Sequence, residues 1–345
     1  MQKNKETYRR IFKLDSKPSL NEEEKSMLLK TILSSKKKES KRRLYRITAI
    51  AASLVLTSFL LFHHFKSQTE ALSIIEVAEL HKKAIKENNK IQLITLDLKL
   101  GRKEVNEIQE YTDSLMTLDQ IIEPNNPQNT FVTIYVPYGK RQEFRLPDNS
   151  TVWLNAGSYL TYKNQMQIGS REVYLNGEGY FDVVHNGNSF TVRTSETSIQ
   201  VLGTSFNVNS YESDEKTAVE LLTGSISLTS MSGSFESILM KPGERINFDH
   251  KNRKLTINKQ ANGADILWTK KQLQLDQLSL PELIKNLERV YNVQIHADKH
   301  LLALQIDYSG RLNIDVDIKS SLQSIYELRD YEIIQKEKEV WIRKK

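Results

Sequence analysis

Residues 171–183 read Arg-Glu-Val-Tyr-Leu-Asn-Gly-Glu-Gly-Tyr-Phe-Asp-Val, with alternating runs on either side of Asn176-Gly177. Alternation of apolar and polar residues is typical of a β-strand with one buried face. Asn-Gly is a favoured pair for a tight hairpin turn, because both residues accept a positive φ. The stretch therefore predicts two strands, over residues 172–175 and 180–184, joined by a turn.

The same pattern extends in both directions from this stretch. Turn residues such as Pro147-Asp-Asn149, Asn186-Gly187 and Thr223-Gly224 separate the alternating runs. We expect an all-β domain over residues 130–262, and the sequence does not choose between a sandwich, a barrel and stacked hairpins. The other predicted strands cover residues 131–136, 143–146, 151–155, 190–194, 199–202, 206–210, 218–222, 225–228, 246–248 and 255–258.

Residues 263–345 have a different, mixed pattern. A strand at 272–275 precedes Ser279-Leu-Pro-Glu282, a capping box with proline in the first helical turn. Asp317 is placed to cap a second helix. Strands are expected at residues 293–296, 305–308, 331–334 and 340–342, so the order is β-α-β-β-α-β-β, a small α+β domain of the split-βαβ type.

An uncharged stretch near the N-terminus predicts one membrane span. Residues 47–62 carry no charge, and counting to Phe65 reaches the lower end of the roughly 17 to 25 residues that cross a bilayer. Seven cations and one acid fill residues 36–46, whereas only Lys66 directly follows the span, so the N-terminus is expected in the cytoplasm. A cleavable signal peptide would need an unusually long charged region before its apolar segment. A buried core helix would not explain why cations are dense before the uncharged stretch and sparse after it. We expect a single-pass membrane protein with a transmembrane helix over residues 47–65.

The predicted cytoplasmic head covers residues 1–46 and is expected to be short and helical. Ser19 and Glu22 offer a capping box for a helix over residues 22–33. So short a head could hardly bury the apolar face of this helix by itself. The helix therefore either binds a partner through this face, packs it on residues 11–14, or frays. That face contains Met27, Leu28 and Ile32, with Leu29 and Leu33 beside them.

Residues 66–129 are predicted to be a connector outside the membrane. They contain a helical stretch at 71–88, an alternating run at 91–100 and a second, polar helical stretch. The sequence Pro124-Asn-Asn-Pro127 then marks a boundary before the β domain.

Composition and motif searches exclude several classes of site. The chain has 345 residues, 39% hydrophobic and 27% charged, with a net charge of +6, which is globular composition with a basic bias. It has no cysteine, which excludes disulfides, thiolate metal sites and a lipid anchor on cysteine. There is no P-loop, nucleophile elbow or complete dinucleotide fingerprint, and His296 and His300 lack a third metal ligand nearby in sequence. We expect no cofactor, no metal and no direct binding of nucleic acid by the basic head, whose charge next to a membrane is explained by orientation.

Three blocks of sequence carry a family resemblance. They are residues 145–158, Arg-Leu-Pro-Asp-Asn-Ser-Thr-Val-Trp-Leu-Asn-Ala-Gly-Ser, then residues 171–183, then residues 201–208, Val-Leu-Gly-Thr-Ser-Phe-Asn-Val. In this order they closely resemble the signature blocks of FecR-type regulators. The tail from Trp268 is similar to the C-terminal domain that accompanies the FecR domain in Bacteroidetes members, so the resemblance covers about residues 130 to 345.

The resemblance implies a transmembrane anti-sigma factor of the bacterial inner membrane, with its C-terminus in the periplasm. Its head would sequester an extracytoplasmic-function sigma factor. Its periplasmic part would receive a signal from the signalling domain of a TonB-dependent outer-membrane receptor, and transcription regulation would be the output. Asn149 stands where the family usually has glycine, and asparagine tolerates a left-handed turn. The head is shorter, and the connector longer, than the family pattern.

Gly203 and Thr204 match by type the bond at which some family members cleave themselves. The Thr204 hydroxyl would attack the carbonyl of Gly203 and give an ester that water opens, which requires a strained turn and a stabilised oxyanion. This would be a single event and not turnover, so the protein is not expected to be an enzyme. The alternative is that Gly203 makes a tight turn and Thr204 bonds the backbone.

A second hypothesis for the function is a membrane-anchored periplasmic binding module, for envelope glycan or protein, with a purely topogenic N-terminus. Trp153, Tyr159 and Tyr162 would then form the binding surface. A tryptophan on an alternating strand is more often part of a core, which weakens that reading for Trp153.

Overall fold

The computed structural model describes residues 21–31, 53, 56–58, 73–86, 88–97, 107–111, 116–117, 130–164, 166, 171–261, 263–325 and 328–345. The chain divides into two compact units, Met1–Ala71 and Leu72–Lys345. In the first unit, residues 22–31 form the predicted head helix, and its side chains are exposed. The predicted span of residues 47–65 lies outside the described residues, apart from Ser53 and residues 56–58, which are helical. No helix within the described ranges is both long and apolar enough to cross a membrane.

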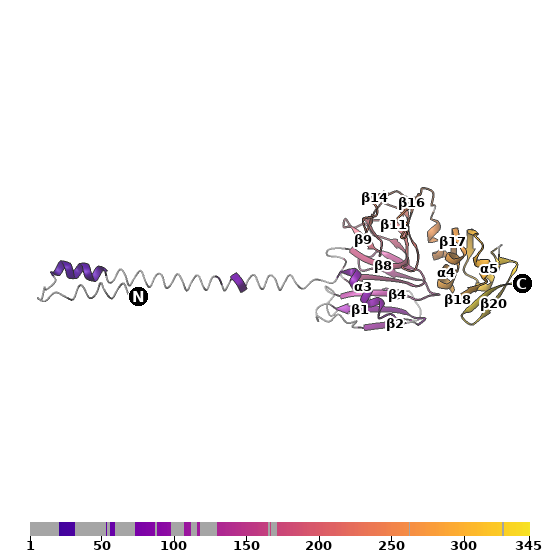
Figure 1. Ribbon diagram of the computed structural model, residues 1–345, viewed down its shortest axis with the longest axis horizontal. Coiled ribbons are helices and arrows are strands. Elements are labelled where there is room, and N and C mark those ends of the chain that lie inside the picture. The colour runs from indigo at the N-terminus through magenta and orange to yellow at the C-terminus, as the bar shows by residue number, and fades with distance from the viewer. Residues whose placement is uncertain are drawn as a thin grey trace. The chain divides into compact units, whose positions relative to one another are not determined.

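The second unit begins with the all-β domain that the sequence predicts. Within the described residues, strands β1 to β16 form one curled sheet (Figure 1). Its strands are β1 Ile91–Asp97, β2 Glu107–Tyr111, β3 Met116–Thr117, β4 Thr130–Val136, β5 Gln142–Arg145, β6 Thr151–Leu154, β7 Ser158–Lys163, β8 Arg171–Asp182, β9 Phe190–Arg193, β10 Thr197–Val201, β11 Ser205–Ser210, β12 Lys216–Thr223, β13 Ile226–Ser230, β14 Ile238–Met240, β15 Arg245–Asp249 and β16 Leu255–Asn258.

Strand β8 joins the two halves of the sheet. Its first part pairs with β7 and, in parallel, with β9, while its second part pairs with β6 and β11. The halves curl toward each other, so apolar side chains of both share one core; Val132 and Leu160 come from one half, Phe181 and Phe206 from the other. Burial of this apolar surface is the main force that holds the domain together.

The predicted hairpin turn at Asn176-Gly177 is wrong, because β8 runs through it as one strand. Gly177 has a φ of 118°, and a Cβ atom there would lie 2.3 Å from the Ser158 hydroxyl oxygen. The glycine therefore lets β8 pass close to β7 where the strand leaves one half of the sheet for the other.

The described part of the predicted connector adds helix α3 and strands β1, β2 and β3 to this domain. Strand β1 pairs with β4, and β2 pairs with β1. Helix α3, Ile74–Lys82, begins at a capping box of Ser73 and Glu76 and packs Ile74, Val77 and Ala78 on the sheet. Residues 107–111 and 116–117 are strands, so the predicted second helical stretch is wrong there: their pairing with β1 and β5 outweighs local propensity.

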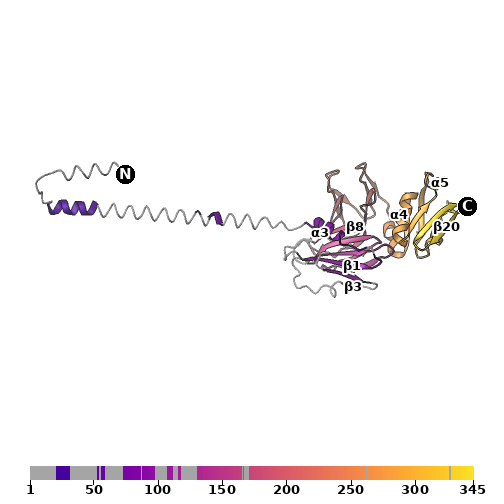
Figure 2. The same ribbon diagram turned by 60° about the horizontal axis from the view of Figure 1, so that its bottom comes forward.

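The C-terminal domain has the predicted order of strands and helices, with one extra turn of helix. The predicted split-βαβ arrangement is wrong, because the two strands that α4 joins lie in different sheets. A 3₁₀ helix, η4 Ala264–Lys270, leads into it. Strands β17 and β19 pair antiparallel, and β18 lies parallel to β21 in a second sheet, β18-β21-β20, beside α4 (Figure 2). The elements are β17 Gln272–Ser279, α4 Leu280–Tyr291, β18 Gln294–Ala297, α5 Lys299–Leu302, β19 Asp307–Asn313, α6 Ile318–Gln323, β20 Tyr331–Lys336 and β21 Glu339–Lys344.

Both predicted helix caps of this domain are present. The Ser279 amide donates to Glu282 Oε2 at 2.9 Å, and the Ser320 amide donates to Asp317 Oδ1 at 3.0 Å. Leu283 and Leu287 of α4 are fully buried in a core that is separate from the core of the β domain. The second unit thus contains two domains, each with a core of its own.

Candidate functional site

Gly203 and Thr204 lie between β10 and β11, at the rim of the β domain. Thr204 and Val183 pair through their backbones: the Thr204 amide donates to the Val183 carbonyl at 3.2 Å, and the Val183 amide donates to the Thr204 carbonyl at 3.0 Å. The Thr204 side chain is buried, and its hydroxyl donates to the Ser225 carbonyl at 3.2 Å. The bond is held in an ordered, hydrogen-bonded turn.

Two neighbours enclose the Gly203-Thr204 bond. Gly224 has a φ of 86°, and a Cβ atom on it would lie 2.6 Å from the Thr204 hydroxyl oxygen and 2.7 Å from the Gly203 carbonyl oxygen. Both oxygens therefore face the same point of the backbone. A Cβ atom on Gly203 would lie 2.5 Å from Cβ of His185, whereas the φ of Gly203 is not positive. Gly203 is thus required for close packing and not for a left-handed turn.

A buried arginine joins two backbone segments that lie next to this bond. Arg171, at the start of β8, is fully buried; its Nη1 donates to the Val184 carbonyl at 2.9 Å and its Nη2 to the Leu202 carbonyl at 3.3 Å. The Asn188 carbonyl also accepts from Nη2. One guanidinium group therefore ties the chain before His185 to the chain before Gly203.

Asp148 is the counter-ion of Arg171 and is equally buried. Its Oδ2 lies 3.0 Å from Nη1 of Arg171 and accepts the Ser150 hydroxyl at 2.8 Å. The Ser150 hydroxyl oxygen in turn accepts the Val184 amide at 3.2 Å. Asn149, between them, has a φ of 69°, as expected for the residue that replaces the family's glycine.

Sequence reasoning did not find the Asp148 and Arg171 pair. Each residue stands where a charge is ordinary, Asp148 in a turn and Arg171 at the first position of a strand. The only signal is that both lie within the sequence blocks that carry the family resemblance.

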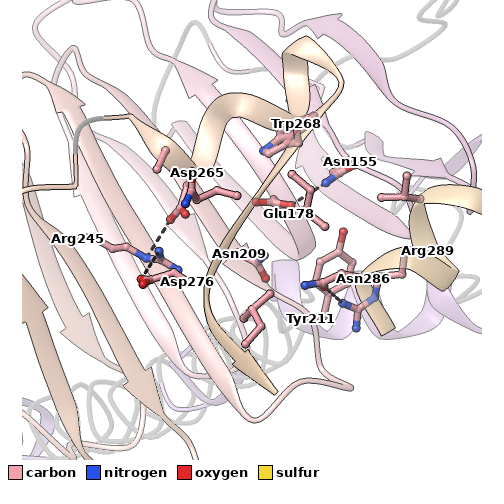
Figure 3. A pocket seen from close by; sticks show the side chains of 15 residues that line it. Asn155, Glu178, Asn209, Tyr211, Arg245, Asp265, Trp268, Asp276, Asn286 and Arg289 are labelled. Atoms are coloured by element: carbon pink, nitrogen blue, oxygen red, sulfur yellow. Dashed lines mark hydrogen bonds and ion pairs between the residues drawn. The ribbon is translucent and has the colours of Figure 1, made fainter. Parts of the chain in front are cut away.

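A second polar cluster lies where the β domain meets the C-terminal domain (Figure 3). Glu178 of β8 is buried, and both of its oxygens accept amide N–H groups: from Asn155 Nδ2 at 2.7 Å and from Asn207 Nδ2 at 3.0 Å. The Trp268 indole N–H of η4 donates to the Asn207 side-chain oxygen at 3.3 Å. Burial raises the pKa of Glu178 to about 7, although these hydrogen bonds oppose the rise.

Arg289 of α4 makes a further polar contact between the two domains. It is buried, it forms an ion pair with Asp214, and its Nη2 donates to the Ser213 hydroxyl at 2.8 Å. Its guanidinium carbon lies 3.9 Å from the centre of the Tyr211 ring. Carboxylate and ring together compensate the buried cation.

The aromatic residues considered for glycan binding do not form an exposed platform. Tyr159 and Tyr162 are buried in the β domain. Trp153 is half-buried, and its ring centre lies 5.3 Å from that of Tyr180 on the neighbouring strand. These side chains pack against their neighbours in the β domain.

His296, one of the two histidines considered as metal ligands, contacts a carboxylate and an aromatic ring. Nε2 of His296 contacts the Glu339 carboxylate, and its ring stacks on Trp341 with centres 5.5 Å apart. The described part of the chain contains no cluster of three or more side chains that could hold a metal ion.

Comparisons with known proteins agree with the described geometry. Residues 132–227 match the family model described as FecR protein. Two crystal structures of a "putative anti-sigma factor" from Parabacteroides distasonis are similar to this chain, with TM-scores of 0.57 and 0.56 and sequence identities of 26% and 27%. Each match covers 62% of this chain and 99% of the other chain. No curated protein matches the sequence. Residues 132–227 of this chain are therefore a FecR domain.

Proposed function

We propose that this protein is a single-pass anti-sigma factor of the bacterial inner membrane. Its cytoplasmic head sequesters an extracytoplasmic-function sigma factor, and its periplasmic domains receive a signal from the signalling domain of a TonB-dependent outer-membrane receptor. The FecR match over the core of the β domain carries this proposal, and the similarity to the anti-sigma structures from Parabacteroides distasonis supports it.

The head helix supports the proposed contact with a sigma factor. Met27, Leu28 and Leu29 are 73%, 55% and 62% exposed. Full burial of such a side chain against a partner contributes roughly 1.5 to 3 kcal/mol. Three adjacent apolar side chains on one exposed helix therefore offer an anchor for a partner of the head.

The charge pattern supports the proposed topology. The seven cations of residues 36–46 precede the uncharged stretch at residues 47–62. Cationic segments remain on the cytoplasmic side during insertion, so the β domain and the C-terminal domain face the periplasm.

Co-purification tests the proposed partner. The full-length protein is expressed with the extracytoplasmic-function sigma factor of the same cell, and we expect the two to co-purify in detergent. A triple variant, Met27→Ser with Leu28→Ser and Leu29→Ser, should lose most of the sigma factor because the apolar anchor is gone. A matched variant of the same helix, Glu23→Ser with Lys30→Ser, should retain it. If the unaltered protein retains no sigma factor, the anti-sigma function is refuted and a topogenic anchor is favoured.

We further propose that the bond between Gly203 and Thr204 breaks once in the mature protein. The Thr204 hydroxyl oxygen attacks the Gly203 carbonyl carbon, the C–N bond breaks, and the Thr204 nitrogen takes up the hydroxyl proton. Water then hydrolyses the ester to a Gly203 carboxylate and a free Thr204 hydroxyl. The step is motivated by the match of this pair to the cleaved bond and by the close enclosure of both oxygens beside Gly224; the Thr204 hydroxyl must first leave the Ser225 carbonyl.

A set of threonine variants tests the cleavage. On a denaturing gel the unaltered protein should give two fragments that meet at residue 203. Thr204→Ala should give one full-length band, and Thr204→Ser, which keeps a hydroxyl, should restore the fragments. Thr217→Ala removes another buried threonine hydroxyl, one that hydrogen-bonds Ser210 and His250, and should leave cleavage unchanged. Fragments that persist in Thr204→Ala would exclude this nucleophile.

A further inference from the structure

A small chamber lies inside the contact between the β domain and the C-terminal domain (Figure 3). Its volume is about 110 Å³, and strands β8, β11 and β15 line it on one side, with η4, β17 and α4 on the other. One water needs only roughly 10 to 15 Å³ of such volume, so the chamber has room for a small head group. Contacts between domains are common places for ligand sites.

The chamber adjoins a wider cleft of about 600 Å³ between the same two domains. The two cavities share several lining residues, so a molecule in the cleft could place one end in the chamber. The shared residues are Asn209, Arg245, Asp276, Leu278 and Asn286.

The charges around the chamber leave one carboxylate without a cation. Arg245 is engaged by Asp265 at 3.1 Å and by Asp276 at 3.5 Å. Arg289 is engaged by Asp214. Within the described residues, no lysine or arginine forms an ion pair with Glu178.

Glu178 accepts hydrogen bonds but has no cationic partner among the described residues. The amides of Asn155 and Asn207 occupy both carboxylate oxygens, but they carry no net charge. A buried carboxylate without a counter-ion is costly, and its pKa rises in response. Burial raises the pKa of Glu178 to about 7. A cation that entered the chamber would therefore stabilise the ionised form of Glu178 over the protonated form.

We propose that the chamber binds a cationic amine or guanidinium head group, whose charge is the counter-ion that Glu178 lacks. Asn209, Asn286 and Asp276 line the same chamber, and side chains of these types can accept further hydrogen bonds from its N–H groups. The head group belongs either to a free small molecule or to an arginine or lysine side chain that a partner protein inserts through the cleft. This inference does not depend on the proposed anti-sigma function.

Paired probes that differ only in charge test the proposal. Binding to the full-length protein in detergent is measured by calorimetry at pH 8 and constant ionic strength. Methylguanidinium is compared with neutral methylurea, and a short peptide that contains arginine is compared with the same peptide that contains citrulline. We expect the cationic member of at least one pair to bind saturably and its neutral counterpart to bind at least about tenfold more weakly, a difference of about 1.4 kcal/mol.

Variants locate the site. Glu178→Gln should weaken binding of the cation about tenfold. Glu172→Gln changes a carboxylate on the same strand that pairs with Arg193 away from the chamber, and it should have no effect. Binding of methylguanidinium indicates a free ligand, and binding of the arginine peptide alone indicates a partner side chain; either result supports the chamber. Equal binding of the charged and neutral probes to the unaltered protein would overturn the proposal, as would full binding by folded Glu178→Gln.

Discussion

Buried charged residues set the local geometry of the β domain. Arg171 and Asp148 are both inaccessible to solvent, and the hydrogen bonds of Arg171 reach carbonyls on both segments that flank the Gly203-Thr204 bond. A buried ion pair contributes little net stability, but loss of one partner is costly because the other charge remains buried. The pair therefore acts as a positional constraint on the turn.

Replacement of Arg171 is predicted to destabilise the domain and loosen this turn. Arg171→Met should lower the free energy of unfolding by about 3 kcal/mol, because the Asp148 carboxylate and the carbonyls of Val184 and Leu202 lose their partner. Urea unfolding measures the loss, and hydrogen exchange of residues 183–204 should become faster.

Arg193→Met is the matched control for this prediction. It removes an arginine whose ion pair with Glu172 is partly exposed, with side chains 34% and 28% accessible. Such pairs contribute about 1 kcal/mol or less. Equal effects of the two substitutions would show that Arg171 has no special part in the turn.

At the scale of elements, helix α3 depends on a buried histidine. His81 is fully buried; its Nδ1 lies 2.5 Å from the Thr133 hydroxyl, and its Nε2 has no hydrogen-bond partner in the described part of the chain. Burial lowers the pKa of His81 to about 4, from 6.5. The docked helix therefore requires the neutral imidazole.

Docking of α3 is predicted to weaken in mild acid. Because the folded-state pKa of His81 lies below its unfolded value, stability is complete above about pH 6.5 and falls as the pH drops toward 4. At pH 5 the loss should be about 2 kcal/mol. Unfolding of the whole protein between pH 7 and pH 5, together with hydrogen exchange in residues 74–82, measures it.

Two histidine variants separate this effect from general acid sensitivity. The difference in unfolding free energy between the unaltered protein and His81→Phe should change by about 2 kcal/mol from pH 7 to pH 5, since only the unaltered protein contains this imidazole. Glu178, whose raised pKa acts in the opposite direction, titrates in both proteins and cancels from the difference. His185→Gln alters an exposed histidine and should leave the dependence unchanged. Identical pH profiles of the unaltered protein and His81→Phe would show that His81 does not cause the acid sensitivity.

Within the unit Leu72–Lys345, the separate apolar cores of the β domain and the C-terminal domain are joined by a mainly polar contact. The contact includes the Trp268 hydrogen bond to Asn207, the Arg289 ion pair with Asp214, and Glu220, whose carboxylate accepts the Gly263 and Asp265 amides at 2.7 and 2.8 Å. Polar contacts of this kind are typical of domains that can move relative to each other. A ligand in the chamber would touch both domains at once and so bias their relative position.

Elements that depend on local interactions could be predicted from the sequence alone. Alternation predicted most strands of the β domain, and the capping residues Ser279 and Asp317 predicted helices α4 and α6 of the C-terminal domain, because periodicity and caps act within a few residues. The turn at Asn149 was likewise predictable from the left-handed conformation that asparagine tolerates.

Contacts between residues that are far apart in the sequence depend on the tertiary fold. Asn176-Gly177 has the composition of a hairpin turn, yet close packing on Ser158 makes it the crossing point of one long strand. Likewise, nothing local distinguishes Arg171 or Glu178 from surface charges. Their burial comes from strands and helices far away in sequence, and it is burial in a medium of low dielectric that makes one a fixed anchor and the other a carboxylate in need of a cation.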